Sequence, residues 1–212
     1  MKGISKSDVS KNPNPKTISD LDLVQKIKNG EQHHFSEIVS RYENLIYQYT
    51  LRMCGNQPDA EDILQETFLN AFRAIDRFRG DSKLATWLYR IANNSCLMKK
   101  RKSKFAPEKE LSLSDIISEP GSRNYQYLEA SNASPMSKLL DVELKEKLQQ
   151  IILDLPKKHR QSFVLADIQG FSGQEIADIL GVSIPTVKSR LHRARLFVRQ
   201  KLSHYLEIET RI

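Results

Sequence analysis

The sequence has no long apolar run and few cysteines. Its 212 residues include only two cysteines, Cys54 and Cys96. No window approaches the roughly 18 consecutive apolar residues that a membrane-spanning helix needs. Residues 1–19 form a polar tail without the apolar stretch of a secretory signal, so we expect a cytoplasmic protein with no direct membrane insertion. Both cysteines lie in apolar periodic segments, which favours buried thiols in a reducing compartment over a disulfide framework.

Strand-type alternation and metal-ligand spacing are also scarce. His33 and His34 are adjacent but have no second pair at ligand spacing, so we expect no metal and no cofactor. Almost every periodic segment repeats at 3.6 residues, which predicts an all-α fold. The net charge of +7 bears on the choice of partners rather than on the fold.

The first half of the chain carries four segments with helical periodicity. Asp20 is placed to cap the first helix, whose apolar positions are Leu21, Val24 and Ile27. A second helix is expected from Phe35 to about Gly55, and a third begins at Pro58 and Asp59. The apolar face of the third helix comprises Ala60, Ile63, Leu64, Thr67, Phe68, Ala71 and Ile75. The fourth helix turns Leu84, Trp87, Leu88 and Ile91 inward and runs into four basic residues at 99–102.

Between residues 103 and 136 the periodicity disappears. Prolines interrupt this segment, and five acidic residues outnumber three basic ones. A stretch this long without periodicity is uncommon inside a compact domain, so we interpret it as a flexible interdomain linker. The predicted organisation is therefore two small helical domains, at residues 20–102 and 137–212, joined by this linker.

The second domain contains a helix-turn-helix between Ser172 and Lys201. Ser172 and Glu175 have the spacing of a capping box, and Gly181 stands where a left-handed C-cap is needed. Ser183 can cap the next helix, and Pro185 fits its first turn. Two helices joined by such a short turn are typical of DNA-binding proteins.

The second helix of this motif has an uninterrupted basic face. Six positive charges fall between residues 185 and 201 with no acidic residue among them. Such a face repels itself unless it meets a polyanion, so phosphate contact is favoured over a merely solvated helix. Thr186, Lys188, Ser189 and His192 lie near the start of this helix, where they would reach base edges in a major groove. We also expect phosphate contacts from Lys157, Lys158 and Arg160.

The first domain carries two further polar surfaces. On its third helix Asp59, Glu61, Asp62 and Glu66 face away from the apolar side, which suits either plain solvated surface or a site for a basic partner protein. On its fourth helix aromatic, basic and amide residues alternate after a polar loop. That mixture suits single-stranded nucleic acid, because rings stack on bases and cations follow phosphates.

These segments resemble a known family. Residues 59–68, DAEDILQETF, are similar to the polymerase-binding helix of bacterial sigma factors. Residues 78–94 are similar to their promoter-melting and minus-ten segment, and residues 181–195 to their minus-thirty-five reader. The order and separation resemble the extracytoplasmic-function (ECF) group of the sigma-70 family over residues 20–102 and 137–205.

The resemblance implies a promoter-specificity subunit without catalytic residues. It would bind core RNA polymerase, with the third helix on the clamp helices of the largest subunit and the second domain near the flap of the second-largest subunit. It implies polymerase contacts from Asp59, Asp62, Gln65 and Glu66. It implies minus-ten contacts, on double-stranded and non-template single-stranded promoter DNA, from Arg79, Asp81, Ser82, Lys83, Arg90, Asn93, Asn94, Lys100 and Arg101. It implies minus-thirty-five contacts from Thr186, Lys188, Ser189, Arg190, His192, Arg193 and Arg195.

The resemblance also implies an anti-sigma factor as a partner and a linker that threads toward the RNA exit path. One turn after Asn94, Met98 stands where many members carry a polar reader, so the minus-ten sequence stays open. Two other functions are compatible with parts of the sequence. A dimeric helix-turn-helix regulator would bind palindromic sites. A nuclease would use Asp59, Asp62 and Glu66 as metal ligands, although no second acidic element faces them.

Overall fold

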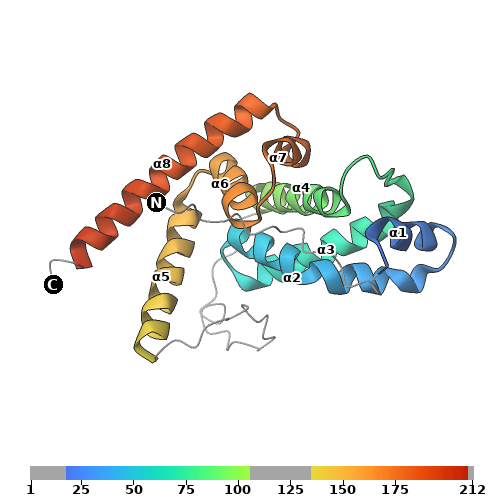
Figure 1. The fold of residues 1–212 in the computed structure, drawn as a ribbon, viewed down its shortest axis with the longest axis horizontal. Helices are drawn as coiled ribbons and strands as arrows, with labels where there is room; N and C mark the ends of the chain where they lie inside the picture. Colours follow the sequence, from blue (N-terminus) through green and yellow to red (C-terminus); the bar gives the residue numbers. More distant parts are fainter. Residues whose placement is uncertain (1–17, 106–134, 210–212) are drawn as a thin grey trace, which may run out of the picture.

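The computed structural model describes residues 18–105 and 135–209, and within these ranges every regular element is helical (Figure 1). The N-terminal part comprises α1 (Asp20–Lys28), η1 (Gln32–His34), α2 (Phe35–Cys54), α3 (Gln57–Ala74), η2 (Ile75–Arg77) and α4 (Leu84–Phe105). The C-terminal part comprises α5 (Pro135–Asp154), α6 (Lys157–Phe163), η4 (Val164–Ile168), α7 (Gly173–Leu180) and α8 (Ile184–Glu209). The all-α prediction is confirmed.

Local signals fix the helix ends of the N-terminal part. Gly55 ends α2 at φ 84°, a left-handed conformation that glycine adopts without the clash of a Cβ atom. Asn56 caps α3, because its Oδ1 accepts the backbone N–H of Asp59 at 2.9 Å. The cap of α1 is Ser19 rather than the predicted Asp20, since the Ser19 hydroxyl accepts the N–H of Asp22 at 3.2 Å.

The apolar face of α3 is buried at all seven predicted positions, against α2 and α4. The prediction for α1 is wrong at one position. Leu21 is 59% exposed, whereas Leu23 is fully buried with Val24 and Ile27. Leu21 and Leu23 are both apolar and both compatible with a helix, so only the packing of α1 on the rest of the domain decides between them.

The C-terminal part packs α5, α6 and α7 against α8. The short helix predicted around residues 163–168 is instead a turn of π-helix, η4, that continues directly from α6 and leads to Gly170 at φ 75°. Val187, Ala194 and Val198 of α8 are buried as predicted, and Leu191 is half-buried.

The two parts are not separate bodies. Figure 1 shows α7 lying against α4, and the rings of Tyr89 and Phe171 meet edge to face with centroids 4.8 Å apart. The predicted organisation, two small domains joined by a flexible linker, does not include this contact. Helix α4 continues to Phe105 and α5 begins at Pro135, so residues 106–134 of the predicted linker lie outside the described residues.

Candidate DNA and polymerase interfaces

The helix-turn-helix is built by the caps that the sequence predicts. Ser172 and Glu175 form a reciprocal capping box, in which the Ser172 N–H donates to Glu175 Oε2 at 2.9 Å and the Glu175 N–H donates to Ser172 Oγ at 3.3 Å. Gly181 ends α7 at φ 63°. Ser183 then accepts the N–H of Thr186 at 3.4 Å and starts α8. These caps fix the angle between the two helices and therefore the face that α8 presents.

The polar face of α8 is accessible. Lys188, Ser189, His192 and Arg193 are exposed, and Thr186 and Arg190 are half-buried. Ser189, His192 and Arg193 lie on the side away from the buried Val187, Ala194 and Val198, and Thr186, Lys188 and Arg190 flank that buried side. Arg190 and Arg193 also act on His159 of α6: burial is the larger cause, and the two positive charges add to it, in lowering the pKa of that imidazole. The basic field of α8 thus extends over the neighbouring helix.

Arg195 differs from the other predicted readers. Its guanidinium forms a two-pronged ion pair with Asp167, with Nε to Oδ2 at 3.0 Å and Nη2 to Oδ1 at 2.7 Å. The hydrogen bond to Asp167 raises the pKa of Arg195. This pair joins α8 to η4, so the structure gives Arg195 a positioning role within the domain.

Not all of the residues predicted to contact the minus-ten DNA are exposed on α4 and the loop before it. Arg90 and Asn94 are exposed, as are Arg79, Asp81 and Lys83 of the preceding loop, while Ser82 is half-buried. The side chains of Lys100 and Arg101 lie outside the described residues. Among the predicted minus-ten residues whose side chains the structure describes, one is buried and is the exception to this exposure.

That exception is Asn93, which is only 3% exposed. Its Oδ1 accepts hydrogen bonds from the Tyr49 hydroxyl at 3.2 Å and from the Gln161 amide of α6. A base edge cannot reach Asn93 in this arrangement, because the C-terminal part covers it. Tyr89, one turn earlier, donates its hydroxyl to Gln169 Oε1 at 2.7 Å across the same contact.

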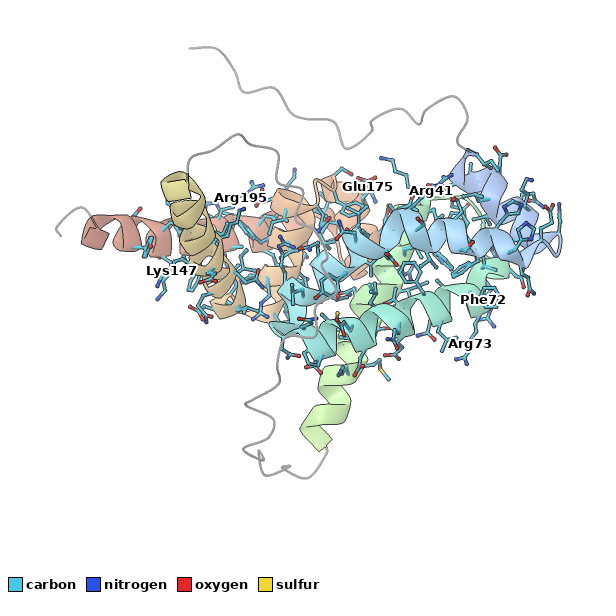
Figure 2. The ribbon with its side chains drawn as sticks, turned by 90° about the horizontal axis from the view of Figure 1, so that it is seen from below. Arg41, Phe72, Arg73, Lys147, Glu175 and Arg195 are labelled. Atoms are coloured by element: carbon cyan, nitrogen blue, oxygen red, sulfur yellow. The ribbon has the colours of Figure 1, made fainter. Side chains whose placement is uncertain are left out.

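An open groove separates the two parts beside this contact. It has a volume of about 690 Å³ and is lined by the loop at residues 77–82, Trp87 and Arg90 on one side, and by α7 and the turn after it on the other. Lys83, the residue after this loop, forms an ion pair with Glu175 at 3.1 Å, and Figure 2 shows Glu175 on α7. The groove thus brings the predicted minus-ten loop next to the turn of the helix-turn-helix.

Arg160 and Lys157 donate hydrogen bonds to backbone carbonyls at the interdomain contact and do not point freely into solvent. Arg160 is half-buried and donates to the carbonyl of Met53 at 3.0 Å, to that of Leu155 at 3.2 Å and to that of Leu153. Lys157 donates to the carbonyl of Cys96 at 3.4 Å. Burial lowers the pKa of Arg160. The prediction that Arg160 contacts phosphate is incompatible with these bonds.

The acidic face of α3 includes residues that pair with Lys99 and residues that are exposed to solvent. Lys99 of α4 reaches Asp59 at 2.6 Å and Asp62 at 2.9 Å. Burial opposes the charged form of Lys99, but the bonds to both carboxylates outweigh it and raise the Lys99 pKa. Asp59 also bonds to the Asn56 amide at 3.0 Å and is half-buried. Asp62, Gln65 and Glu66 remain exposed. Lys99 contacts both carboxylates and compensates one of their two negative charges, which disfavours the metal-ligand alternative there.

Two segments match known protein families. Residues 38–105 match Sigma-70 region 2, and residues 145–198 match Sigma-70, region 4. The chain is 39% identical over 179 residues to the ECF RNA polymerase sigma factor SigW of Bacillus subtilis, which covers 84% of this chain and 94% of that protein. The chain belongs to the ECF group of sigma factors. It is also 32% identical over 188 residues to the sigma-E factor of Haemophilus influenzae, covering 87% of this chain and 96% of that protein.

Solved structures have the same fold as this sigma factor. RpoE of Bartonella quintana, in complex with the anti-sigma factor NepR, aligns with a TM-score of 0.59 at 20% identity, over 80% of this chain and 96% of that one. CnrH, in complex with the cytosolic domain of CnrY, aligns with a TM-score of 0.58 at 24% identity, over 86% of this chain and 96% of that one. The sigma factor acts in promoter-specific transcription initiation by RNA polymerase.

Two further observations concern the rest of the sigma factor. Among the described residues, no helix is both long and apolar enough to span a membrane. The structure also brings Glu31, His33 and His34 together, with one ligand atom of each within 4.8 Å of the others. The residue spacing in the sequence predicts no metal site here. The Glu31 carboxylate already bonds to His34 at 3.1 Å and lies 3.8 Å from Lys26.

The residues of the interdomain contact are not predicted as such by the sequence. Tyr89, Asn93 and Gln161 are polar or amphipathic, so periodicity gives them no inward preference. The sequence gives one indirect indication of this contact. Helix α4 has polar positions on more than one face, which a helix packed on a single neighbour does not need.

Proposed function

We propose that the exposed face of α8 reads the minus-thirty-five element, with Thr186, Lys188, Ser189, Arg190, His192 and Arg193 in the major groove or on its phosphates. The observation that carries this proposal is the sidedness of α8. Its apolar side is buried at Val187, Ala194 and Val198, so its basic side is the face left for a ligand. Phosphate contact compensates the mutual repulsion of these charges. Arg195 supports the reading helix through Asp167.

The minus-ten element is assigned to the loop at residues 78–83 and to Arg90, Asn93 and Asn94 of α4, with Lys100 and Arg101 beyond them. Arg79, Arg90 and Asn94 are exposed, and Arg79 and Arg90 line one side of the groove, which supports this assignment. Asn93 becomes available only when Gln161 withdraws. Productive promoter binding therefore requires separation of the two parts, which form domains at residues 20–102 and 137–212.

Polymerase binding is assigned to the exposed acidic residues of α3. Asp62, Gln65 and Glu66 would meet the clamp helices of the largest subunit, and Asp59 would hold Lys99 and the cap of α3 in place. The C-terminal domain would sit near the flap of the second-largest subunit, and the acidic linker would lead toward the RNA exit path. The protein would act in the cytoplasm as a non-enzymatic subunit.

An anti-sigma factor is the expected inhibitory partner. The solved relatives RpoE and CnrH are described in complex with NepR and CnrY. A partner that holds the two domains together would keep Asn93 covered and separate the two DNA-reading surfaces from the promoter.

Run-off transcription tests the proposal as a whole. Purified core polymerase plus this protein should yield a transcript from the protein's own upstream region, and core polymerase alone should not. A tight footprint without polymerase, together with no core-dependent transcript, would refute the proposal and favour an autonomous regulator.

The α3 assignment has its own test. Asp62→Ala with Glu66→Ala should weaken core binding at least about tenfold while leaving duplex DNA binding by the free protein unchanged. Glu43→Ala with Glu146→Ala, two exposed acidic residues elsewhere, makes the same change in net charge and serves as the control. Equal losses in both double variants would attribute the effect to net charge and not to this face.

A further inference from the structure

The turn between α1 and α2 brings three metal-binding side chains together. Glu31, His33 and His34 each place one ligand atom within 4.8 Å of the other two. Among residues 18–105 and 135–209, no other group of three histidine, cysteine, aspartate or glutamate side chains converges to this distance. The two imidazole rings lie side by side, with centroids 4.2 Å apart and planes inclined by 36°. Imidazole nitrogen and carboxylate oxygen are both ligands of zinc.

The backbone of this turn holds the three residues in place. The Glu31 N–H donates to the Lys26 carbonyl of α1 at 3.1 Å. Within η1 the His34 N–H donates to the Glu31 carbonyl at 3.2 Å, and the Ser36 hydroxyl donates to the His33 carbonyl at 2.7 Å. The three donors therefore start from ordered backbone, which reduces the entropy that binding an ion costs.

The distance between the Glu31 and His34 ligand atoms suits a tetrahedral zinc ion. Zinc bonds of about 2.0–2.2 Å to nitrogen and oxygen place two ligand atoms about 3.4 Å apart at the tetrahedral angle. Glu31 Oε2 and His34 Nε2 are 3.1 Å apart, where they share a hydrogen bond that an ion would replace. His33 is exposed, so rotation of its side chain can bring its ring nitrogen to the same separation.

The donor set determines which ion fits this turn. Two imidazoles and one carboxylate suit Zn²⁺, whereas Mg²⁺ and Ca²⁺ prefer oxygen ligands alone. Glu31 and His33 are exposed and His34 is half-buried, which leaves the fourth position of a tetrahedral ion to water. The Lys26 ammonium lies 3.8 Å from Glu31 Oε2 and opposes a cation, so it limits the affinity of the site.

We propose that Glu31, His33 and His34 form a zinc site that fastens the turn between α1 and α2. The site directly precedes Phe35, whose ring packs on that of Phe72 in α3 with centroids 5.0 Å apart. Zinc stabilises the start of α2 against unfolding, because the ion binds the folded turn more tightly than the unfolded chain. The inference concerns the free protein and does not depend on the function proposed above.

Competition with a chromophoric zinc chelator tests the site on the full-length, metal-free protein. We expect one equivalent of Zn²⁺ per chain, and Co²⁺ in its place should give the visible absorption of a four-coordinate ion. Zinc should also raise the midpoint of thermal unfolding, and excess chelator should reverse the rise. Absence of zinc uptake, or a midpoint that bound zinc does not raise, would overturn the proposal.

Histidine variants locate the bound ion. His33→Ala and His34→Ala should each weaken zinc binding at least about tenfold, because each removes one of three ligands. His159→Ala removes an imidazole elsewhere and, as the matched control, should leave the affinity unchanged. The competing donors are the free thiols of Cys54, half-buried, and Cys96, buried. Unchanged affinity in His33→Ala, which alters an exposed side chain, would assign the zinc to such other donors and overturn the site.

The charge of Lys26 gives a test with the opposite sign. Lys26→Gln removes a positive charge 3.8 Å from Glu31 and should tighten zinc binding roughly two- to tenfold. Arg199→Gln makes the same change in net charge at an exposed position of α8 and should leave zinc binding unchanged. Weaker binding in Lys26→Gln, or equal effects in both variants, would contradict the placement of the ion at Glu31.

Discussion

Arg193 and Arg195 make a matched pair for testing which side chains of α8 meet DNA. They lie two residues apart on one helix, carry the same guanidinium and are both exposed. The sequence predicts DNA contact for both. The structure separates them, because Arg195 is held by both oxygens of Asp167, at 3.0 and 2.7 Å.

The expected magnitudes follow from these surroundings. Arg193→Ala should weaken duplex binding by about 1–3 kcal/mol, roughly 5- to 150-fold, and should reduce by about 1 the slope of log affinity against log salt. Arg195→Ala should leave that slope nearly unchanged, because its charge is already compensated. It should instead cost about 0.5–1 kcal/mol of folding stability, the upper range for an exposed ion pair with good geometry.

Fluorescence anisotropy on a labelled duplex, repeated over a range of salt concentrations, measures both slopes. Thermal unfolding of the free variants measures the stability change. The reasoning is refuted if Arg195→Ala reduces the salt slope as much as Arg193→Ala does. That result would mean that the Asp167 pair opens on DNA and that Arg195 contacts phosphate as the sequence predicts.

Three further outcomes are expected. Gln161→Ala removes the hydrogen bond from α6 to Asn93, worth about 1 kcal/mol, and should raise the ratio of open to closed protein about fivefold. Acrylamide quenching of the fluorescence of Trp87, the single tryptophan, should then increase. The control Gln174→Ala, which loses a hydrogen bond within α7, should not change the quenching. Gly55→Ala should cost more than about 1 kcal/mol in thermal unfolding, because residue 55 has φ 84° and touches Leu153, whereas Gly173→Ala, with nothing within 4 Å, should cost nothing. Burial raises the pKa of Glu175, but bonds to Ser172 and Lys83 outweigh it and lower the pKa in the folded protein. The folding stability that these bonds contribute is therefore complete above the ordinary glutamate pKa of 4.5 and is lost as the pH falls through the lower folded pKa. Glu175→Gln should abolish that part of the acid dependence of stability.

Local chemistry explains which parts of the fold were predictable. The capping box at Ser172, the left-handed Gly181 and the buried face of α3 each depend on residues close in sequence, and all three are confirmed. The choice of Leu23 over Leu21 required the neighbouring helices, because both positions suit an amphipathic helix.

The docking of the two domains was beyond local reasoning. It depends on polar pairs such as Tyr89 with Gln169 and Asn93 with Gln161, which are 80 and 68 residues apart. Tyr89, Asn93 and Gln161 are buried and Gln169 is half-buried. No periodicity predicts burial of such residues, because it depends on a distant partner that supplies a hydrogen bond. The ion pairs on the acidic face of α3 were likewise not predictable, because no spacing in the sequence indicates that Lys99 pairs with Asp59 and Asp62.

The covering of Asn93 by Gln161 has a consequence for competition among DNA sites. If only a fraction of the free protein is open, its apparent dissociation constant for the minus-ten strand rises by the inverse of that fraction. A genome offers an enormous excess of non-specific sites, and a subunit that is always open would be titrated onto them. Under the proposed function, polymerase that favours the open state would restore the affinity only in the holoenzyme. The domain contact would then restrict DNA reading to molecules that are already bound to polymerase.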